Sequence, residues 1–388
     1  MAAPKTRRAI IVSRIFSPEP SAASIRLGAL ARELSDRNVA VTVLTTRYAD
    51  DESVVEPPLT VKRWPVKRDA NGYVRGYLSY LSFDIPLALR LLVERKPDFV
   101  IVEPPPTTGL VVRVVCALRS IPYFSYAPDI LSDAMRTIGS SSLATRVVRW
   151  LETRVHRGAR LVLSVGTAVT DRLGALGVRD NVVTVGNGID TSLFGLDGET
   201  ETEASPYFVY AGNASEVHGA LIFLDAFKLV APRHPEVTMI FIGYGSDFDE
   251  IRRRTVSFPE NQVRVLTRVP PALLAPWLRG AVASLASVRP ESAYDYAVPT
   301  KMYASLACGT PVVFAGSDVT AQVIRHNRLG WATRYDVSDV AHTLGVALAT
   351  TTDRSEREAL AAWVQAEASM ETVARTAADA IDAEMAQG

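Results

Sequence analysis

The stretch VPTKMYASLACGTPVVFAG, residues 298–316, places a lysine at the start of a predicted helix. Pro299 suits the first turn of a helix and Gly309 suits the position just after its end, so the spacing predicts a helix between them. Its apolar face is made of Met302, Tyr303, Leu306 and Ala307. If that face packs inward, Lys301 and Ala304 point away from the core. A lysine at a helix start beside an anion site can hold a phosphate; the alternative is a lysine that only solvent contacts.

The segment YAGNASEVHG, residues 210–219, has the composition of a strand that runs into a ligand-binding loop. A predicted strand ends at Gly212, and a helix is expected to start near Gly219 after a short polar loop. The start of a helix is a natural anion site because its first N–H groups have no partner within the helix. Further donors come from Asn213, Ser215 and His218. The loop is therefore a candidate phosphate site, with a plain surface loop as the alternative.

Two other strand exits give weaker signals. Gly243 and Gly245, in FIGYG, keep a strand end open to a closely approaching ligand, but such glycines are also common in turns without one. The predicted strand Ala9–Ser13 is followed by RIFSPEPSAAS and not by G-x-G-x-x-G, which disfavours a nicotinamide dehydrogenase. Ser21 and Ala22 in this loop can bring backbone N–H groups to a substrate; the alternative is a plain connection.

Short apolar runs alternate with helical patterns along the chain. The runs interpreted as strands are 9–13, 40–46, 98–103, 161–165, 181–185, 207–212, 237–245, 263–266, 282–287 and 311–316. Between the first two of them, apolar residues recur at helical spacing at Leu27, Leu30, Ala31 and Leu34. Nearly all-apolar strands that alternate with helices predict parallel sheets covered on both faces.

The predicted architecture is α/β, with two tandem Rossmann-like domains that face a central cleft. The first domain spans 1–195, the acidic segment 196–206 is a linker or exposed loop, and the second domain spans 207–365. The Ala-rich tail 366–388 is expected to form a helix that packs back toward the first domain. In such sheets ligands bind beyond the carboxyl ends of the strands, where the loops described above are expected to lie.

Composition and charge narrow the classes of function. The 388 residues suit two domains, and 48% hydrophobic with 22% charged residues is typical of a globular protein. Because 42 basic residues balance 42 acidic ones, nothing indicates nucleic-acid binding. Cys116 and Cys308 lie in apolar runs and are expected to be buried free thiols, and the scattered histidines predict no metal site.

The sequence pattern predicts neither a membrane span nor a signal peptide. No apolar run reaches the roughly 18 residues of a membrane span. The amino-terminal run AIIV is too short for the core of a signal peptide. The expected location is therefore the cytoplasm.

Taken together, these stretches resemble the retaining glycosyltransferases of family 4, which have the GT-B fold. The motifs that carry the resemblance occur in the expected order over nearly the whole chain: PDFVIVEPP, IPYFSYAPDI, VGNGIDTSLF, YFVYAGN, FIGYG, LTRVPPALLAPWLRGA and VPTKMYASLACGTPVV. NGID and ACGTPVV are the most specific of them. The start VPTK resembles a branch with a P-S-K donor-site signature, whose members modify bacterial surface polysaccharide or lipid-linked sugars.

The resemblance implies a donor site in the second domain and an acceptor site in the first. The donor is a nucleotide-diphosphate sugar whose anomeric configuration is retained, and no metal or other cofactor is required. A departing nucleotide diphosphate needs its charge stabilised more than it needs a strong base. The implied donor-binding residues are Gly212, Asn213, Ser215, His218, Gly243, Arg268, Val269, Thr300, Lys301 and Tyr303, with Arg268 and Val269 beside the nucleobase.

In the first domain, APDILSDAM resembles a D-L-W-P stretch of the same branch. Asp129 is the candidate for contact with the acceptor hydroxyl or for handling its proton; the alternative is an aspartate that caps the next helix. Asp133, with Ser21 and Ala22, completes the candidate acceptor site. The aromatic and apolar stretch 73–92 is either a peripheral membrane contact, as in relatives with lipid acceptors, or a buried helix.

The sequence departs from the family at the donor site. Many members carry an Arg and a Lys where Asn213 and His218 stand here, although His218 can be protonated beside a phosphate. Many members also carry a pair of glutamates, whose places fall at Tyr296 and Ala304.

The prediction is therefore a cytoplasmic or peripheral membrane glycosyltransferase that acts on a hydroxyl of a glycan, a lipid-linked sugar or a natural product. The alternatives are a nucleotide-sugar 2-epimerase and a non-catalytic partner of an active transferase.

Overall fold

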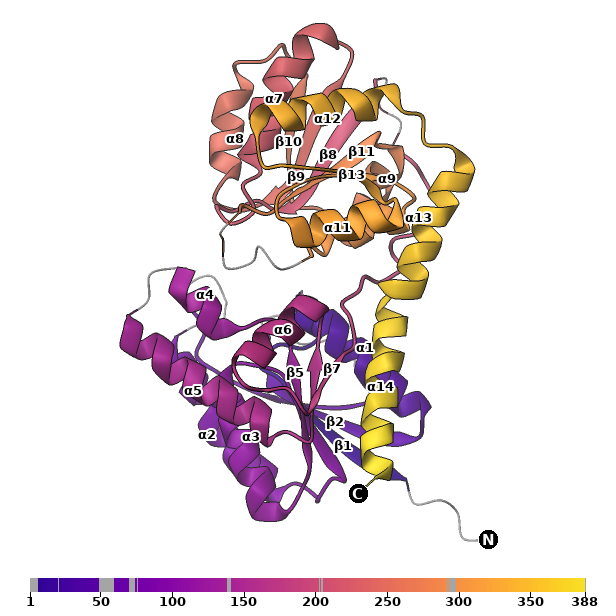
Figure 1. The fold of residues 1–388 in the computed structure, drawn as a ribbon. Helices are drawn as coiled ribbons and strands as arrows, with labels where there is room; N and C mark the ends of the chain where they lie inside the picture. The colour runs from indigo at the N-terminus through magenta and orange to yellow at the C-terminus, as the bar shows by residue number, and fades with distance from the viewer. Residues whose placement is uncertain are drawn as a thin grey trace. The chain divides into compact units, whose positions relative to one another are not determined.

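The chain forms two compact units, each with its own sheet (Figure 1). The computed structural model describes residues 6–19, 21–48, 59–69, 74, 76–137, 141–201, 203, 205–290, 292 and 298–387. Unit 1 consists of residues 1–187 and 370–388, and unit 2 is Gly188–Ser369. The predicted α/β class with two Rossmann-like domains is confirmed.

Unit 1 holds a seven-stranded parallel sheet in the order β3-β2-β1-β4-β5-β6-β7. Its strands are β1 (Arg7–Val12), β2 (Val39–Thr46), β3 (Thr60–Trp64), β4 (Phe99–Val102), β5 (Tyr123–Ala127), β6 (Leu161–Ser164) and β7 (Val182–Thr184). Its helices are α1 (Ala22–Asp36), α2 (Tyr77–Val93), α3 (Pro106–Arg119), α4 (Leu131–Thr137), α5 (Ser142–Gly158), α6 (Thr167–Ala175) and α14 (Met370–Ala386). The strand order reverses between β1 and β4, and in such sheets that point is where ligands bind.

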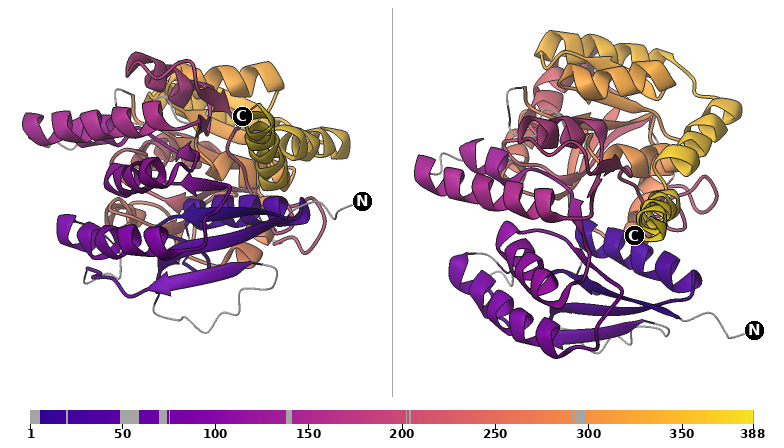
Figure 2. Two further views of the ribbon diagram at one scale, coloured as in Figure 1. Left: turned by 90° about the horizontal axis from the view of Figure 1, so that it is seen from below. Right: turned by 60° about the horizontal axis from the view of Figure 1, so that its bottom comes forward.

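Helix α14 completes the core on one face of this sheet. It lies beside α1 (Figure 1), and Ala377 and Ile381 pack with Leu27 and Leu34 against the strands. Helix α3 packs on β4 and β5, with α2 and α5 on either side of it (Figures 1 and 2). Each helix has an apolar stripe to bury, and the two faces of the sheet accept those stripes.

Unit 2 holds a six-stranded parallel sheet in the order β10-β9-β8-β11-β12-β13. Its strands are β8 (Tyr207–Asn213), β9 (Thr238–Tyr244), β10 (Val263–Thr267), β11 (Ala283–Ser287), β12 (Val312–Ala315) and β13 (Gly330–Thr333). Its helices are α7 (Leu221–Val230), the 3-10 turn η1 (Ala231–Arg233), α8 (Phe248–Thr255), α9 (Pro271–Gly280), α10 (Lys301–Ala307), α11 (Asp318–Asn327), α12 (Val337–Ala349) and α13 (Arg354–Glu367). Here the order reverses between β8 and β11.

Alternation along β8 divides the core of unit 2 into two layers. Phe208 and Tyr210 pack with α7, α8 and α12 on one face. Val209 and Ala211 pack with α9, α10, α11 and α13 on the other. Successive side chains of a strand point to opposite faces, which explains why this strand is apolar throughout.

The sequence pattern did not mark three of the strands. β3 and β13 are edge strands with half-buried or exposed residues, and β5 is a short aromatic run. The acidic segment 196–206 is hydrogen-bonded to α9, where Arg279 Nε donates to the Glu199 carbonyl at 2.7 Å. It is part of unit 2, and the division between the units falls after Asn187. Cys116 and Cys308 are both buried free thiols, as predicted.

Candidate functional site

Lys301 carries a buried amine at the carboxyl end of β8. Its Nζ donates to the Tyr210 hydroxyl at 2.6 Å and to the Asn213 carbonyl at 3.0 Å, and it lies 4.1 Å from the centre of the Tyr210 ring. Burial lowers the pKa of Lys301 to about 7. Among the described residues no carboxylate forms an ion pair with it. A buried cation without a counter-ion is a natural place for an anionic ligand.

Helix α10 is buried on every side, and this burial holds Lys301, its first residue, in place. All six residues after Lys301, Met302 to Ala307, are buried, so the predicted two-faced helix is wrong: the short helix is enclosed by the core of unit 2. Ala304 belongs to that core, and the Tyr303 ring packs 6.2 Å from that of Trp363 on α13. Gly309 ends the helix with φ +71°, as predicted. Tyr296, the other place of the family glutamates, lies outside the described residues.

Two glycines let the ends of β8 and β9 approach the loop that follows β8. Gly212 and Gly243 are neighbours in register, with φ +116° and +153°. A Cβ on Gly243 would overlap the Gly212 carbonyl oxygen, and one on Gly212 would lie 3.9 Å from Lys301 Cε. A side chain at Gly243 is therefore excluded, and the Gly212 backbone stays open toward Lys301.

The loop between β8 and α7 is fixed by its own polar side chains. His218 Nδ1 is hydrogen-bonded to Ser215 Oγ at 2.8 Å, and the His218 carbonyl accepts from Ser287 Oγ at 2.6 Å. Burial, and then the charge of Lys301, lower the pKa of His218 to about 4, so the ring of the free protein is neutral at neutral pH. Helix α7 begins at Leu221, with no side-chain cap and no acid in its first turn. The Ile222 and Phe223 N–H groups donate to the Gly219 and Ala220 carbonyls, and no acid of the first turn itself competes with an anion at this helix start.

The remaining donor-site predictions fall in two places. Arg268 lies 5.3 Å from the Tyr244 ring, and Tyr244 pairs with Asn213, which puts Arg268 at the same edge of the sheet. Thr300 is the N-cap of α10, directly before Lys301. Val269 packs against the core, as Tyr303 does. The structure thus gathers Gly212, Asn213, Ser215, His218, Gly243 and Lys301, with Arg268 and Thr300 adjoining them.

In unit 1, charged side chains converge where β4 and β5 end. Arg26 Nη2 donates to Glu103 Oε1 at 2.5 Å, and both side chains are buried. Asp129 stands nearby, and its pKa is raised by burial first and then by the negative charge of Glu103, which Arg26 opposes. Asp129 is thus a carboxyl group whose environment favours the protonated form, as a group that accepts a proton requires.

Sequence reasoning missed Arg26 and Glu103. A signal was present for each: Arg26 stands one turn before Leu30 on the apolar face of α1, and Glu103 follows the apolar run of β4 directly. Charged residues in those positions are buried only when they are paired.

Glu152 anchors the segment that carries Asp129. Its carboxylate accepts from the Leu131 amide at 2.8 Å and from Ser132 Oγ at 2.7 Å, which caps the start of α4. The predicted alternative for Asp129, a helix cap, is thus a role that Glu152 fills from α5. Asp133 lies in the first turn of α4, and its Oδ2 is 3.8 Å from Arg172 Nε.

The predicted acceptor residues at the start of α1 have structural roles. Ser21 Oγ accepts from the Ser24 amide at 3.0 Å, so Ser21 is the N-cap of α1. Ala22 is the first residue of that helix. The structure does not connect them by any described hydrogen bond to Asp129 or Asp133, within the residues that it covers.

Replacing Arg26 with Met should destabilise the protein strongly. Glu103 would stay buried without its partner, which costs about 3–5 kcal/mol of unfolding free energy. The double variant Arg26→Met, Glu103→Leu should recover most of the loss because neither member of the pair is left charged without its partner. Urea denaturation of the three proteins measures both effects; equal midpoints for the wild type and the single variant would contradict them.

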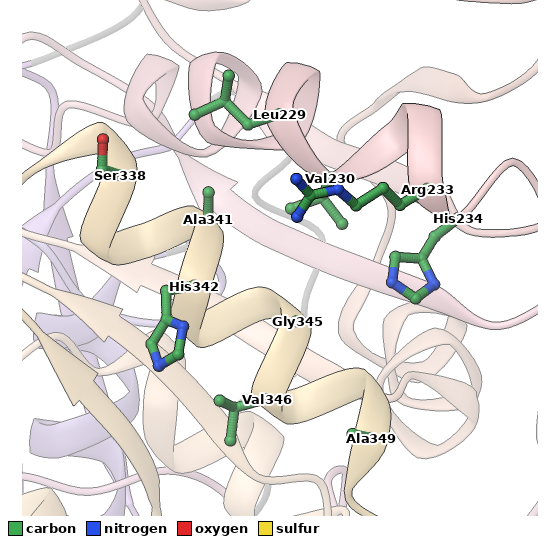
Figure 3. Close-up of a pocket in the computed structure, with 10 residues that line it drawn as sticks. All are labelled: Leu229, Val230, Arg233, His234, Ser338, Ala341, His342, Gly345, Val346 and Ala349. Carbon is green, nitrogen blue, oxygen red and sulfur yellow. The ribbon is translucent and has the colours of Figure 1, made fainter.

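A separate hollow lies elsewhere in unit 2 (Figure 3). It has a volume of about 630 Å³ and is bounded by α7, η1 and α12, with Arg233, His234 and His342 among its lining residues. The chain runs from η1 into the start of β9, so this hollow is at the amino edge of the sheet. None of the predicted site residues lines it. The candidate site is therefore assigned from the Lys301 amine and from its place at the carboxyl ends of the strands, not from the volume of a hollow.

Metal-ligating side chains do not gather in the described part of the chain: no group of three or more His, Cys, Asp or Glu is placed to hold an ion there.

Comparison with known proteins identifies both units. Residues 21–188 match the family model of the glycosyl transferase 4-like domain, and residues 205–349 match that of glycosyl transferases group 1. Together the two matches cover most of the chain. Comparison with curated protein sequences gives no match.

Solved structures share the fold at low sequence identity. The sucrose-phosphate synthase of Thermosynechococcus elongatus superposes with a TM-score of 0.76 at 13% identity, over 98% of this chain and 100% of that one. HepE of Anabaena, solved with UDP and glucose, gives 0.69 at 18% identity, over 96% and 99% of the two chains. Starch synthase IV of Arabidopsis thaliana, solved with ADP and acarbose, gives 0.68 at 12% identity, over 98% and 99%.

The two family models confirm the predicted enzyme class, and neither the epimerase nor the non-catalytic partner is favoured by them. With both units matched to glycosyltransferase domains and the GT-B fold shared with solved structures, the chain belongs to the glycosyltransferases of the GT-B fold.

Proposed function

We propose that the protein transfers a hexosyl group from a nucleotide-diphosphate sugar to an acceptor hydroxyl, with retention at the anomeric carbon and without a bound metal. Unit 2 binds the donor and unit 1 the acceptor. The observation that carries the proposal is Lys301, a buried cation without a carboxylate partner at the glycine-lined end of β8. Retention and the P-S-K branch rest on the sequence resemblance.

The donor site meets the needs of a diphosphate leaving group. Charge develops on the diphosphate as the bond between the anomeric carbon and the phosphate oxygen breaks. Lys301 supplies a positive charge, and the first N–H groups of α7 supply oriented dipoles. Ser215 and neutral His218 add hydrogen-bonding groups. These groups together stabilise the leaving group, which is the role that a metal ion has in other transferases.

On the acceptor side, Asp129 accepts a hydrogen bond from the acceptor hydroxyl and takes its proton as the new glycosidic bond forms. Its raised pKa supports this role, because a base works best when its pKa is close to the working pH. Glu103 and Arg26 are positioning residues that set the charge around it. Asp133 contributes to acceptor binding from the next turn of the same segment.

Uridine nucleotides are the first donors to test. HepE was solved with UDP, and also with UDP-glucose. In this chain Arg268, beside Tyr244, is the residue proposed to lie near the nucleobase. A nucleotide-sugar donor supports a cytoplasmic reaction, and a lipid-linked acceptor would place it at the inner face of the membrane.

Thermal denaturation with a panel of UDP-, GDP- and TDP-sugars tests the proposal. A donor at about 100 times its dissociation constant adds roughly 2.7 kcal/mol of stability, which appears as a raised melting temperature. We expect a selective shift that EDTA does not change, and turnover when an acceptor is supplied. No shift with any donor would overturn the proposed donor site, and a shift lost in EDTA would overturn the metal-free reaction.

A further inference from the structure

Helix α2 presents an apolar stripe to solvent. Its buried face includes Phe83, Leu87 and Leu91, so it is packed on unit 1 as the buried-helix alternative predicted. The opposite face is exposed and carries Leu78, Leu81, Ile85, Leu89 and Leu92. These positions recur every three or four residues, which places them on one side of the helix. The predicted stretch began at Tyr73, which is outside the described residues.

The stripe continues over the two neighbouring helices. Val114 and Leu118 are exposed on α3, and Leu143, Val147 and Trp150 on α5. Helices α2, α3 and α5 lie side by side (Figures 1 and 2). More than half of the large apolar side chains that are exposed among the described residues lie on these three helices. Such a concentration marks an interaction surface, whereas scattered exposed leucines do not.

Two arginines of α3 join the helices into one layer. Arg113 Nη1 donates to the Arg154 carbonyl of α5 at 2.8 Å. Arg119 donates to the Leu91 carbonyl of α2 and, at 2.9 Å, to the Glu94 carbonyl just beyond it. The exposed faces of the three helices are thus held together as parts of one surface, which we call the apolar–basic face.

The charges on this face have one sign. The acids of the three helices are Asp84 and Glu152, and both are buried. Arg146, Arg149 and Arg154 of α5 are exposed, and among the described residues none of them forms an ion pair. Arg154 lies 5.3 Å from the Trp150 ring, so a cation and an amphipathic aromatic ring are adjacent on the surface.

We propose that the apolar–basic face binds the surface of a bilayer that contains anionic phospholipids. Apolar side chains of such a face enter the boundary of the acyl chains, Trp prefers that interface, and arginines are attracted to anionic headgroups. The excess of exposed arginines and the absence of exposed acids on α2, α3 and α5 favour this partner over a second copy of the chain, whose identical charges would repel. No helix in the described part of the chain is long and apolar enough to cross a membrane.

This inference deepens the proposed function by naming the surface on which the acceptor is met, but its test does not depend on catalysis. The full-length protein is sedimented with phosphatidylcholine vesicles that contain or lack phosphatidylglycerol. Wild type should bind only the anionic vesicles, and salt should weaken the binding. Ile85→Ser with Leu89→Ser removes apolar contacts, and Arg146→Glu with Arg149→Glu reverses charges; each should weaken partitioning at least about tenfold.

Matched controls come from unit 2. Leu229→Ser with Leu273→Ser changes two leucines that are exposed to a similar degree as Ile85 and Leu89. Arg233→Glu with Arg325→Glu alters the net charge by the same amount as the α5 variant. Both controls should bind vesicles like wild type. All variants change exposed residues, so melting temperature and the donor-induced thermal shift should stay unchanged.

Three outcomes would overturn the proposal: no binding of wild type to anionic vesicles, equal loss in the control variants, or a dimer in sedimentation velocity that the α2 and α5 variants dissociate. If no donor raises the melting temperature of wild type, that result counts against the proposed function. Vesicle binding would still test the membrane proposal, because it does not depend on the donor.

Discussion

Lys301→Met should abolish donor-induced thermal stabilisation and lower kcat/KM by about 10²–10³-fold, the loss typical of one electrostatic donor to a developing anion. The Lys301 Nζ is held by the Tyr210 hydroxyl and the Asn213 carbonyl, so the charge has a fixed position. The unliganded variant should melt no lower than wild type, because Met fills the site without a buried charge. Donor titration by thermal shift and steady-state kinetics measure both effects.

The pH dependence gives a second readout on the same residue. Burial lowers the pKa of Lys301 from 10.5 to about 7, so the folded state favours the neutral amine. The destabilisation that this causes is fully present below pH 7 and fades as the pH rises toward 10.5. Any gain in melting temperature from Lys301→Met should therefore be largest at or below neutral pH.

Donor binding should also take up a proton above pH 7, because a diphosphate beside Nζ raises the pKa of the amine. Calorimetry in two buffers with different ionisation enthalpies detects that proton. Tyr210→Phe is the matched control: it removes one hydrogen-bond partner of Nζ but keeps the amine, so binding should weaken without being lost. Donor binding by Lys301→Met with wild-type affinity would contradict the assignment.

Asp129→Asn should lower kcat by about 10²–10⁴-fold, the contribution typical of a general base. The carboxyl group is buried beside Glu103, and its pKa is raised, so at neutral pH the folded state gains from replacing it with a neutral amide. The variant should therefore keep or raise the melting temperature while it loses activity. Asp171→Asn, the same change at an exposed position on α6, should alter neither.

The pH–rate profile distinguishes a base from a structural aspartate. Because the pKa of Asp129 is raised, the acidic limb of kcat/KM should lie above the range of an ordinary aspartate. Glu103→Gln removes the negative charge that raises it, so this limb should move to lower pH. A profile that Glu103→Gln leaves in place would argue against proton transfer to Asp129.

Local signals predicted the donor half of the site better than the acceptor half. Lys301 follows Pro299, which suits a helix start, and Gly309 suits the end of that helix. Gly212 and Gly243 end apolar runs. These local signals were enough to select Lys301 and the two glycines as candidates. Tyr210, the hydroxyl that holds Lys301, appears in sequence as one more apolar residue of a buried strand. The partner of a buried charge leaves no local pattern: Arg26 and Glu103 each stand out beside an apolar run, but nothing local shows that they pair with each other.

The periodicity of apolar residues predicts the buried face of a helix correctly when the opposite face is exposed to solvent. It predicts the buried face wrongly when the whole helix is buried. α10 shows an apolar stripe in sequence, yet small residues such as Ala304 and Ser305 let it be enclosed on all sides. α2 is the opposite case, since its apolar residues cover both a buried and an exposed face. From the sequence alone, a membrane contact and a buried helix were treated as exclusive alternatives. The helix packs on unit 1 by one apolar face and leaves a second one exposed, so burial does not exclude a contact.

The path of the chain makes unit 2 an insertion within unit 1. The backbone leaves unit 1 after Asn187 and returns at Met370, and Ile189 pairs with Ser369 at the base of the inserted segment. Residues 188–369 therefore have adjacent ends, and we expect them to fold as an autonomous fragment that binds the donor. A fragment that stops at residue 187 would lack α14 and leave Leu27 and Leu34 without their cover. Unit 2 can thus be cut out of the chain as one continuous segment, whereas unit 1 needs both of its segments, 1–187 and 370–388.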